Sequence, residues 1–598
     1  MTRSTRVQWR TRVHRGRNSA RRSNFALAVA LGVCAGLSIT PGTAGAEPEA
    51  VSAAVDRQER VLSERDGIVV SSVSYLLPLP AGAPAHPAEC DRVGYLRYRT
   101  AEGAADSSGA DRIVIQEQGL GGGAVNSDGV AANTVRSARS MGQHIEFWAL
   151  ARRSTCLDET FGFDAALRSG NYLDAVDFYF NGKELEGRRF PGFKTNDQLA
   201  VLDSMGMERV LWDQFEVMRH ELPTREERQR KFVCTGISLG GLVTGFFADW
   251  NFGAAGHGAD QCAAFAAQDS MVSSDPVALQ NTPILRDLTD ALITPLDGVL
   301  QTGFRAGMLP RTFGSIPVLG ARTFLLYRLA GLAAHLDPDG ESQLLAHLPR
   351  DPEIELTLNF LTSPTWAGFA ANGADGSAAI REFRFTNTAL LGMLIDNNSA
   401  NFVLTQQGLG ALDGGPVELK SFPTPGEVTQ IPLIGSFLRM SAGTQQRVFP
   451  TDRAALYTWR NYNDVRGIPY TAPNHEVADI VEVSRQLGTG SPGAYWETYF
   501  PLRLVIDIGA GFGGSRTGEM AALTGRALSR TKPNFVAFAG DSPVPPAVGT
   551  LFPAPALAQV VTLAGYNHVD TIGAAAVQND GQPDHSGQQL AAFIKSLG

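Results

Sequence analysis

The sequence predicts an α/β fold, a doubly wound and mostly parallel sheet that carries a large, mainly helical insertion. Short apolar runs alternate with helical stretches between residues 93 and 270, as in a parallel sheet covered on both faces. The alternation stops at residue 270 and resumes after residue 500. We therefore expect one sheet domain formed by residues 47–270 and 501–598, interrupted by a cap over residues 271–500.

The individual elements follow from the period of the apolar residues. A helix is expected over residues 195–222, and further helices at 321–336 and 387–404 inside the insertion. The polar segment from residue 47 to Arg65 is expected to be loosely held. The predicted strands cover residues 93–99, 112–117, 145–151, 231–236, 262–269, 503–509, 534–541 and 559–565.

The first 46 residues have the composition of a secretory signal peptide. Eight arginines and no acidic residue precede an apolar run, and "TAGA" ends at Ala46. The run has about 15 residues, fewer than the roughly 20 that span a bilayer. We predict cleavage after Ala46, secretion and no stable membrane anchor. Arg21 and Arg22 leave both the general and the twin-arginine export routes open.

The predicted mature chain is strongly acidic. It keeps 43 of the 51 basic residues and all 60 acidic ones, which gives a formal net charge of −17. An acidic surface argues against nucleic acids and anionic membranes as partners.

Four cysteines remain after the predicted cleavage. An even number in an oxidising compartment predicts two disulfides, for which three connectivities are possible. Local spacing favours Cys90 with Cys156 and Cys234 with Cys262. No group of histidines and cysteines has the spacing of zinc ligands, so we expect no metal.

Ser238 is the predicted nucleophile. It lies in "CTGISLGG", after the predicted strand at 231–236 and before an apolar helical stretch. A serine on a sharp strand-to-helix turn exposes its hydroxyl above the sheet, and small flanking residues permit that turn. The alternative is a buried turn serine without a chemical role.

A glycine-rich segment supplies a predicted oxyanion hole. "QEQGLGGG", residues 116–123, follows the predicted strand at 112–117, and such a turn can direct backbone N–H groups at an anion. We expect the donors to be the N–H groups of Leu120 and Leu239. The alternative is that these glycines only form a tight connection.

The expected base is His568, which follows the last predicted strand after a short turn. His585, just before the terminal helix, is the alternative. The acid that orients the imidazole should end a strand, and Asp541 does so 27 residues before His568. Asp269, which ends the strand after the nucleophile, is the second candidate.

The segments "QGLGGG", "GISLGG", "AGD" and "NHVD" together resemble the α/β-hydrolase family, over residues 90–270 and 500–598. The resemblance implies a serine hydrolase that acts through an acyl-enzyme without a cofactor. The strand-to-helix turn "GISLGG" around Ser238, the nucleophile elbow of this family, looks closer to the turn of lipases and esterases than to that of aminopeptidases. Gln118 departs from the family, in which a histidine often precedes the oxyanion glycines.

The insertion and a second glycine motif determine the remaining expectations. A leucine- and phenylalanine-rich cap over the elbow favours a bulky apolar or amphiphilic ester, lactone or amide as the small-molecule substrate. Gly509, Gly511 and Gly514 form a GxGxxG pattern after a predicted strand, which would instead indicate an NAD(P)-binding oxidoreductase. A hydrolase-like fold used only for binding is the third possibility.

Overall fold

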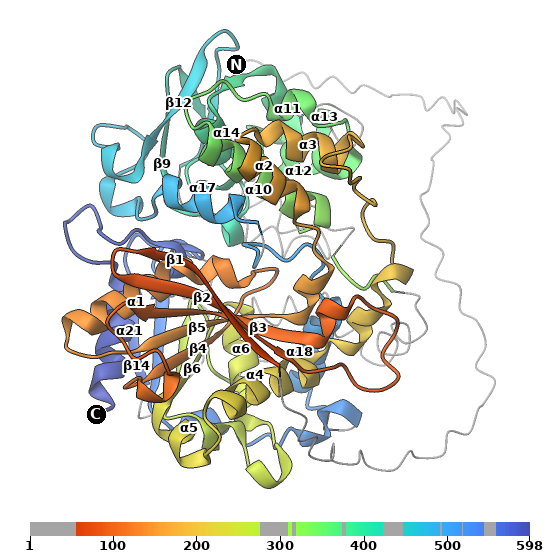
Figure 1. The fold of residues 1–598 in the computed structure, drawn as a ribbon. Coiled ribbons are helices and arrows are strands. Elements are labelled where there is room, and N and C mark those ends of the chain that lie inside the picture. Colours follow the sequence, from red (N-terminus) through yellow and green to blue (C-terminus); the bar gives the residue numbers. More distant parts are fainter. Residues whose placement is uncertain are drawn as a thin grey trace, which may run out of the picture. The chain divides into compact units, whose positions relative to one another are not determined.

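The computed structural model describes residues 56–275, 309–313, 319–372, 378–422, 446–490, 493–516, 518–542 and 558–598 (Figure 1). The predicted signal peptide lies outside these ranges, as do residues 276–308 and 423–445 of the predicted cap. No helix of the described ranges is both long and apolar enough to cross a membrane.

One sheet of nine strands organises the described chain, in the order β1-β2-β3-β5-β4-β6-β7-β13-β14. Neighbours from β1 to β5 are antiparallel, and those from β5 to β14 are parallel. Strands β4, β6 and β7 are buried along their whole length, so both faces of the parallel part are covered. The predicted fold class is therefore confirmed. The strands are β1 (Arg57–Arg65), β2 (Ile68–Leu76), β3 (Arg92–Thr100), β4 (Ile113–Glu117), β5 (Glu146–Ala151), β6 (Phe232–Ile237), β7 (Ala264–Gln268), β13 (Asn534–Ala539) and β14 (Ala558–Leu563).

Two groups of helices pack on this sheet. Helix α1 packs against α21 and contacts β3 and β5. Helix α6 contacts β6, β4 and β7, and α4 packs against both α6 and α18. The helices of the sheet domain are α1 (Asp128–Ser140), α4 (Met207–Glu221), α5 (Arg225–Lys231), α6 (Leu239–Asp249), α18 (Leu502–Phe512), α20 (Asp570–Gly573) and α21 (His585–Ser596).

The predicted strand at 503–509 is wrong, because these residues belong to helix α18. All of its residues from Ile506 to Phe512 are buried, and Asp507 accepts a hydrogen bond from the N–H of Met207 at the start of α4 over 2.9 Å. The expectation of a loosely held segment up to Arg65 is also wrong from residue 57 onward, because β1 pairs with β2. β1 escapes detection because it is an edge strand whose side chains are almost all exposed.

Most of the described chain between β7 and α18 forms a second, largely helical layer. Helix α10 lies at its centre and packs against α12, α14 and α17, and also against α3, which precedes β6 in the chain (Figure 1). Because α10 is buried on nearly all sides, it forms the core of this layer. Its described helices are α10 (Ala321–Leu336), α11 (Leu344–His347), α12 (Pro352–Thr362), α13 (Trp366–Asn372), α14 (Asn387–Ile395) and α17 (Ile480–Gly488), joined by α2 (Phe161–Ser169) and α3 (Tyr172–Phe180).

Small strands complete this layer, in a three-stranded and a two-stranded sheet. They are β8 (Arg384–Phe385), β9 (Gly410–Asp413), β10 (Val417–Leu419), β11 (Val448–Pro450) and β12 (Leu456–Asn461). The boundaries predicted for the cap do not include α3, which packs against its central helix α10, or α2, which packs against α3.

Two disulfides cross-link the sheet domain. Cys90 is joined to Cys156, and Cys234 to Cys262, which confirms the pairing favoured by the spacing. The first links the segment before β3 to the segment after β5, and the second links β6 to the segment just before β7. Such bonds persist in oxidising compartments.

Candidate active site

Ser238 occupies a strained turn between β6 and α6. Its φ of 53° and ψ of −123° lie in a region that residues with a side chain rarely adopt. A Cβ at Gly236 would lie 2.1 Å from the carbonyl carbon of Gly240, so the turn can close only with glycine there. Ser238 caps α6 without a side-chain hydrogen bond, and its hydroxyl is therefore not used in holding the helix.

Neighbouring strands hold the backbone of this turn. The N–H of Ser238 donates to the carbonyl of Gln268 over 3.1 Å, and the hydroxyl of Ser270 donates to the carbonyl of Ser238 over 2.5 Å. Both partners lie at the end of β7. The position of the half-buried Ser238 is thus fixed by the sheet itself.

The glycine-rich segment after β4 passes directly beside Ser238. A Cβ at Gly119 would lie 3.3 Å from Cβ of Ser238 and 3.9 Å from its Oγ. Among the described residues, the N–H groups of Leu120 and Leu239 have no acceptor, and the first N–H groups of a helix such as α6 have none within the helix. Both groups are therefore available to an anion beside Ser238.

Gln118 has a structural role in this segment. Its side chain is fully buried, and its Oε1 accepts a hydrogen bond from the hydroxyl of Ser127 over 2.7 Å. Its Nε2 donates to the carbonyl of Gln116 over 3.4 Å. These contacts connect the segment to the start of α1.

His568 lies in the turn after β14, and Asp269 directly follows β7. Nδ1 of His568 lies 2.6 Å from Oδ2 of Asp269. The Asp269 side chain is fully buried and also accepts hydrogen bonds from the N–H of Ala539 and the hydroxyl of Ser542. A proton held on Nδ1 by the carboxylate leaves Nε2 unprotonated, the form that a base requires.

The prediction of Asp541 as the partner of the imidazole is corrected by this contact, which the structure gives to Asp269. Asp541 follows β13, and its Oδ2 lies 2.5 Å from Nδ1 of His475, a residue of the inserted layer. The two aspartates follow the carboxyl ends of the neighbouring parallel strands β7 and β13. The inserted layer supplies a second histidine there, and it is this histidine that pairs with Asp541.

The two alternative predictions do not have the structural context they need. Gly509 and Gly511 lie inside helix α18, so the GxGxxG pattern does not follow a strand as a dinucleotide-binding turn must. His585 begins α21, stacks on Tyr566 at 6.3 Å and lies 3.4 Å from Asp580. It therefore has the contacts of a partly exposed histidine at a helix start.

Asp570 fixes the turn that carries His568, and sequence analysis missed it. Its carboxyl group accepts hydrogen bonds from the N–H of Asn567 over 2.8 Å and from the N–H of Gly408 over 3.1 Å. Gly408 belongs to the inserted layer, so the turn is attached to that layer. Burial raises the pKa of Asp570 to about 7, against its hydrogen bonds, which lower it. The spacing of Asp570 from His568 gave no sign of this burial.

The fold and the turn at Ser238 together have the arrangement of the α/β-hydrolases. In that fold the nucleophile follows a central strand, and one oxyanion donor follows the nucleophile while the other lies after an earlier strand. The order Ser238, Asp269, His568 is also the chain order known for that fold. We therefore describe the protein as having the α/β-hydrolase fold.

Comparisons with known proteins find only solved structures of low similarity. No family model and no curated protein matches the sequence. Similar solved structures include a loop variant of a haloalkane dehalogenase from Bradyrhizobium elkanii, with a TM-score of 0.26, 10% identity, and coverage of 84% of this chain and 94% of that one. A peroxisomal alpha-beta-hydrolase from Saccharomyces cerevisiae has a TM-score of 0.29 and 10% identity, with coverage of 89% and 91%. A proline iminopeptidase from Mycobacterium smegmatis has a TM-score of 0.25 and 11% identity, with coverage of 90% and 98%. Similarity at these TM-scores says nothing about the chemistry of this protein.

Proposed function

We propose that the protein is a serine hydrolase that cleaves a carboxylic ester through an acyl-enzyme on Ser238. The observation that carries the proposal is the strained Ser238 beside two unused N–H groups, in a fold that also forms the His568–Asp269 pair. A nucleophile, a base with its orienting acid, and oxyanion donors are the parts that acyl transfer requires.

The proposed reaction has two steps. In the first, Oγ of Ser238 bonds to the ester carbonyl carbon while Nε2 of His568 takes its proton. The N–H groups of Leu120 and Leu239 stabilise the oxyanion, and the alcohol leaves with the proton from His568. In the second step, water deprotonated by His568 attacks the acyl-enzyme, and the acid leaves as Ser238 regains its proton. Asp269 stabilises the imidazolium in both steps.

Aromatic side chains of the inserted layer support an apolar substrate. The ring of Phe324 in α10 lies against Gly121, where an added Cβ would meet it at 2.7 Å. The same ring stacks on Trp496 at 5.3 Å. Both rings are buried, so they form an apolar aromatic wall next to the glycine-rich segment 116–123. Such a wall favours an ester with a bulky apolar acyl or alcohol group.

A fluorophosphonate probe tests the proposal most directly. We expect labelling of the protein, with peptide mapping that places the adduct on Ser238, and we expect Ser238→Ala to abolish it. The variant should unfold at the same denaturant concentration as the wild type. Labelling that persists at an unchanged rate in Ser238→Ala would contradict the proposal. A p-nitrophenyl ester series of increasing acyl length then measures the chain-length preference.

We also propose that the protein is secreted after cleavage behind Ala46. The support is the arginine-rich, then apolar, N-terminal sequence together with two disulfides. N-terminal sequencing of the exported protein should start at Glu47. An intracellular, uncleaved product would contradict this proposal.

A further inference from the structure

Arg152, directly after β5, donates hydrogen bonds to backbone carbonyl groups of the glycine-rich residues 116–123, which we call the oxyanion segment. Nη2 donates to the carbonyl of Gln118 and, over 2.7 Å, to that of Gly119, while Nη1 donates to the carbonyl of Gly122 over 3.2 Å. The Arg152 side chain is only 3% exposed. A planar guanidinium can hold several carbonyl groups in one fixed geometry, which an ammonium cannot.

The contact with Gly119 also fixes the direction of a neighbouring N–H group. The carbonyl of Gly119 and the N–H of Leu120 belong to one planar trans peptide unit, so they point in opposite directions. Once Arg152 holds the carbonyl, the N–H of Leu120 must point away from Arg152. A buried positive charge at the carbonyl end also favours negative charge accepted at the N–H end.

Glu497 holds Arg152 in turn. Its Oε1 lies 2.7 Å from Nη1 of Arg152, and its side chain is fully buried. The same residue donates its own backbone N–H to the carbonyl of Gly121 over 2.7 Å. Glu497 lies where the inserted layer returns to the sheet domain, so this return segment and β5 hold the oxyanion segment between them.

We propose that Arg152, held by Glu497, is a positioning residue that directs the N–H of Leu120 at the oxyanion. This inference rests on the proposed function, because it assigns a role in stabilising the same tetrahedral intermediate. The described contacts of Arg152 are with backbone carbonyl groups, Glu497 and the ring of Phe500, and none is with Ser238 or His568. Its effect should therefore fall on the transition state and not on substrate binding.

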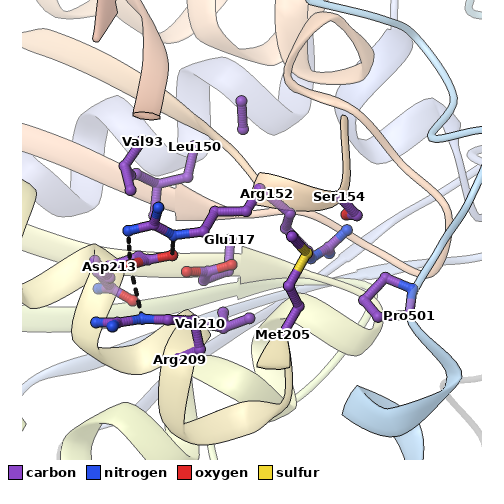
Figure 2. A pocket seen from close by; sticks show the side chains of 13 residues that line it. Val93, Glu117, Leu150, Arg152, Ser154, Met205, Arg209, Val210, Asp213 and Pro501 are labelled. Carbon is purple, nitrogen blue, oxygen red and sulfur yellow. Dashed lines mark hydrogen bonds and ion pairs between the residues drawn. The ribbon is translucent and has the colours of Figure 1, made fainter. Parts of the chain in front are cut away.

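A neighbouring arginine provides a matched control. Arg153 is as buried as Arg152, and its Nε lies 2.7 Å from Oδ2 of Asp213 in an equally close ion pair. Its Nη1 donates to the carbonyl of Cys90 over 2.8 Å, a group outside the oxyanion segment. Arg152 and Asp213 line the same pocket, in which Asp213 also pairs with Arg209 (Figure 2).

The experiment compares Arg152→Lys with Arg153→Lys on an ester that the wild type cleaves. Loss of one oxyanion donor costs about 10²- to 10³-fold in kcat. We expect Arg152→Lys to lower kcat about 100-fold with KM within a few-fold, and to weaken inhibition by an alkyl trifluoromethyl ketone to the same extent. Arg153→Lys should leave both kcat and ketone inhibition within about threefold of the wild type, because the guanidinium of Arg153 binds the carbonyl of Cys90 and not the oxyanion segment. Equal losses of kcat in the two variants would overturn the proposal.

Glu497→Gln keeps the test decisive if Arg152→Lys does not fold. The amide preserves shape and one acceptor, so kcat and ketone inhibition should fall together by about tenfold, because the charge-assisted bond to Arg152 is weakened. An unchanged ketone affinity in this variant would overturn the proposal. Failure of the proposed function would give a different result. A wild type that neither reacts with the fluorophosphonate nor cleaves esters would contradict both proposals. An active wild type whose Arg152 and Glu497 variants are unaffected would contradict only the positioning role of Arg152.

Discussion

Asp269 and His568 are 299 positions apart in the sequence, and Oδ2 of the aspartate lies 2.6 Å from Nδ1 of the histidine. The aspartate comes before the inserted layer and the histidine after it. The pair therefore forms only when the two parts of the sheet, β7 and β13–β14, have assembled.

Substitution of Asp269 and substitution of Asp541, which follow β7 and β13, should differ strongly in their effect on catalysis. Asp269→Asn removes the acceptor that fixes the imidazole tautomer, so kcat should fall by about 10⁴-fold. Asp541→Asn changes the partner of His475 instead, and kcat should stay within about tenfold of the wild type. Steady-state kinetics on one ester decide between them. The reverse order of effects would restore Asp541 as the acid.

Gly240→Ala should disturb both folding and the oxyanion segment. A methyl group at this position would lie 2.2 Å from the carbonyl oxygen of Glu117, and backbone cannot move aside as a flexible side chain can. We expect the free energy of unfolding to fall by about 3 kcal/mol, at the upper end for overpacking, and labelling of Ser238 to slow. Denaturant unfolding measures the first effect. As a control, Gly368→Ala in α13, where a methyl group would meet only a threonine side chain at 3.2 Å, should be close to neutral.

Each disulfide should stabilise the fold, and the one that closes the longer loop should do so slightly more. The two bonds join residues 66 and 28 positions apart. Replacing either pair by alanines should lower the free energy of unfolding by about 3 to 4 kcal/mol, with the larger loss for Cys90 and Cys156. Denaturant titration of both variants measures the order. Four titratable thiols in the exported wild type would show that the bonds do not form.

Glu117 should make stability depend on pH. Burial raises the pKa of its carboxyl group to about 7, and the nearby Arg152 lowers it only in part. The folded protein therefore keeps this group protonated up to a higher pH than the unfolded chain does. Its contribution to stability is present below the unfolded pKa of 4.5 and is lost as the pH rises to about 7.

Glu117→Gln should remove this part of the pH dependence. The variant should be more stable than the wild type at pH 8, by about 3 kcal/mol at most, and the two should converge toward pH 4.5. Denaturant unfolding at several pH values measures the difference. Parallel curves for the two proteins would contradict a buried, proton-binding Glu117.

The sequence was sufficient for the central strands and for the turn at Ser238. The central strands β4 and β6 begin with the short apolar runs "IVI" and "FVC", and two glycines beside Ser238, Gly236 and Gly240, reflect contacts of 2.1 and 2.2 Å that only glycine allows. The edge strand β1 was not recognised, because neither of its faces is buried and its sequence shows no apolar alternation.

Other features depend on contacts that no local pattern contains. The run at 503–509 is rich in β-branched residues, yet it forms helix α18, whose Gly511 allows close approach to Phe246. Asp269 and Asp541 look equivalent in sequence, and the difference between them arises from His475 in the inserted layer. Arg152 could not be assigned either, because its burial depends on Glu497 from a distant segment.

The edge strand β1 has a consequence for self-association. An uncovered edge offers unpaired backbone groups to which a strand of another molecule can add. β1, with the sequence "RQERVLSER", presents arginine and glutamate side chains, and its pairing with β2 shifts register between Val61 and Ser63. Charge and local irregularity both oppose the addition of a further strand. Even at high concentration, the folded protein should therefore not polymerise through this edge.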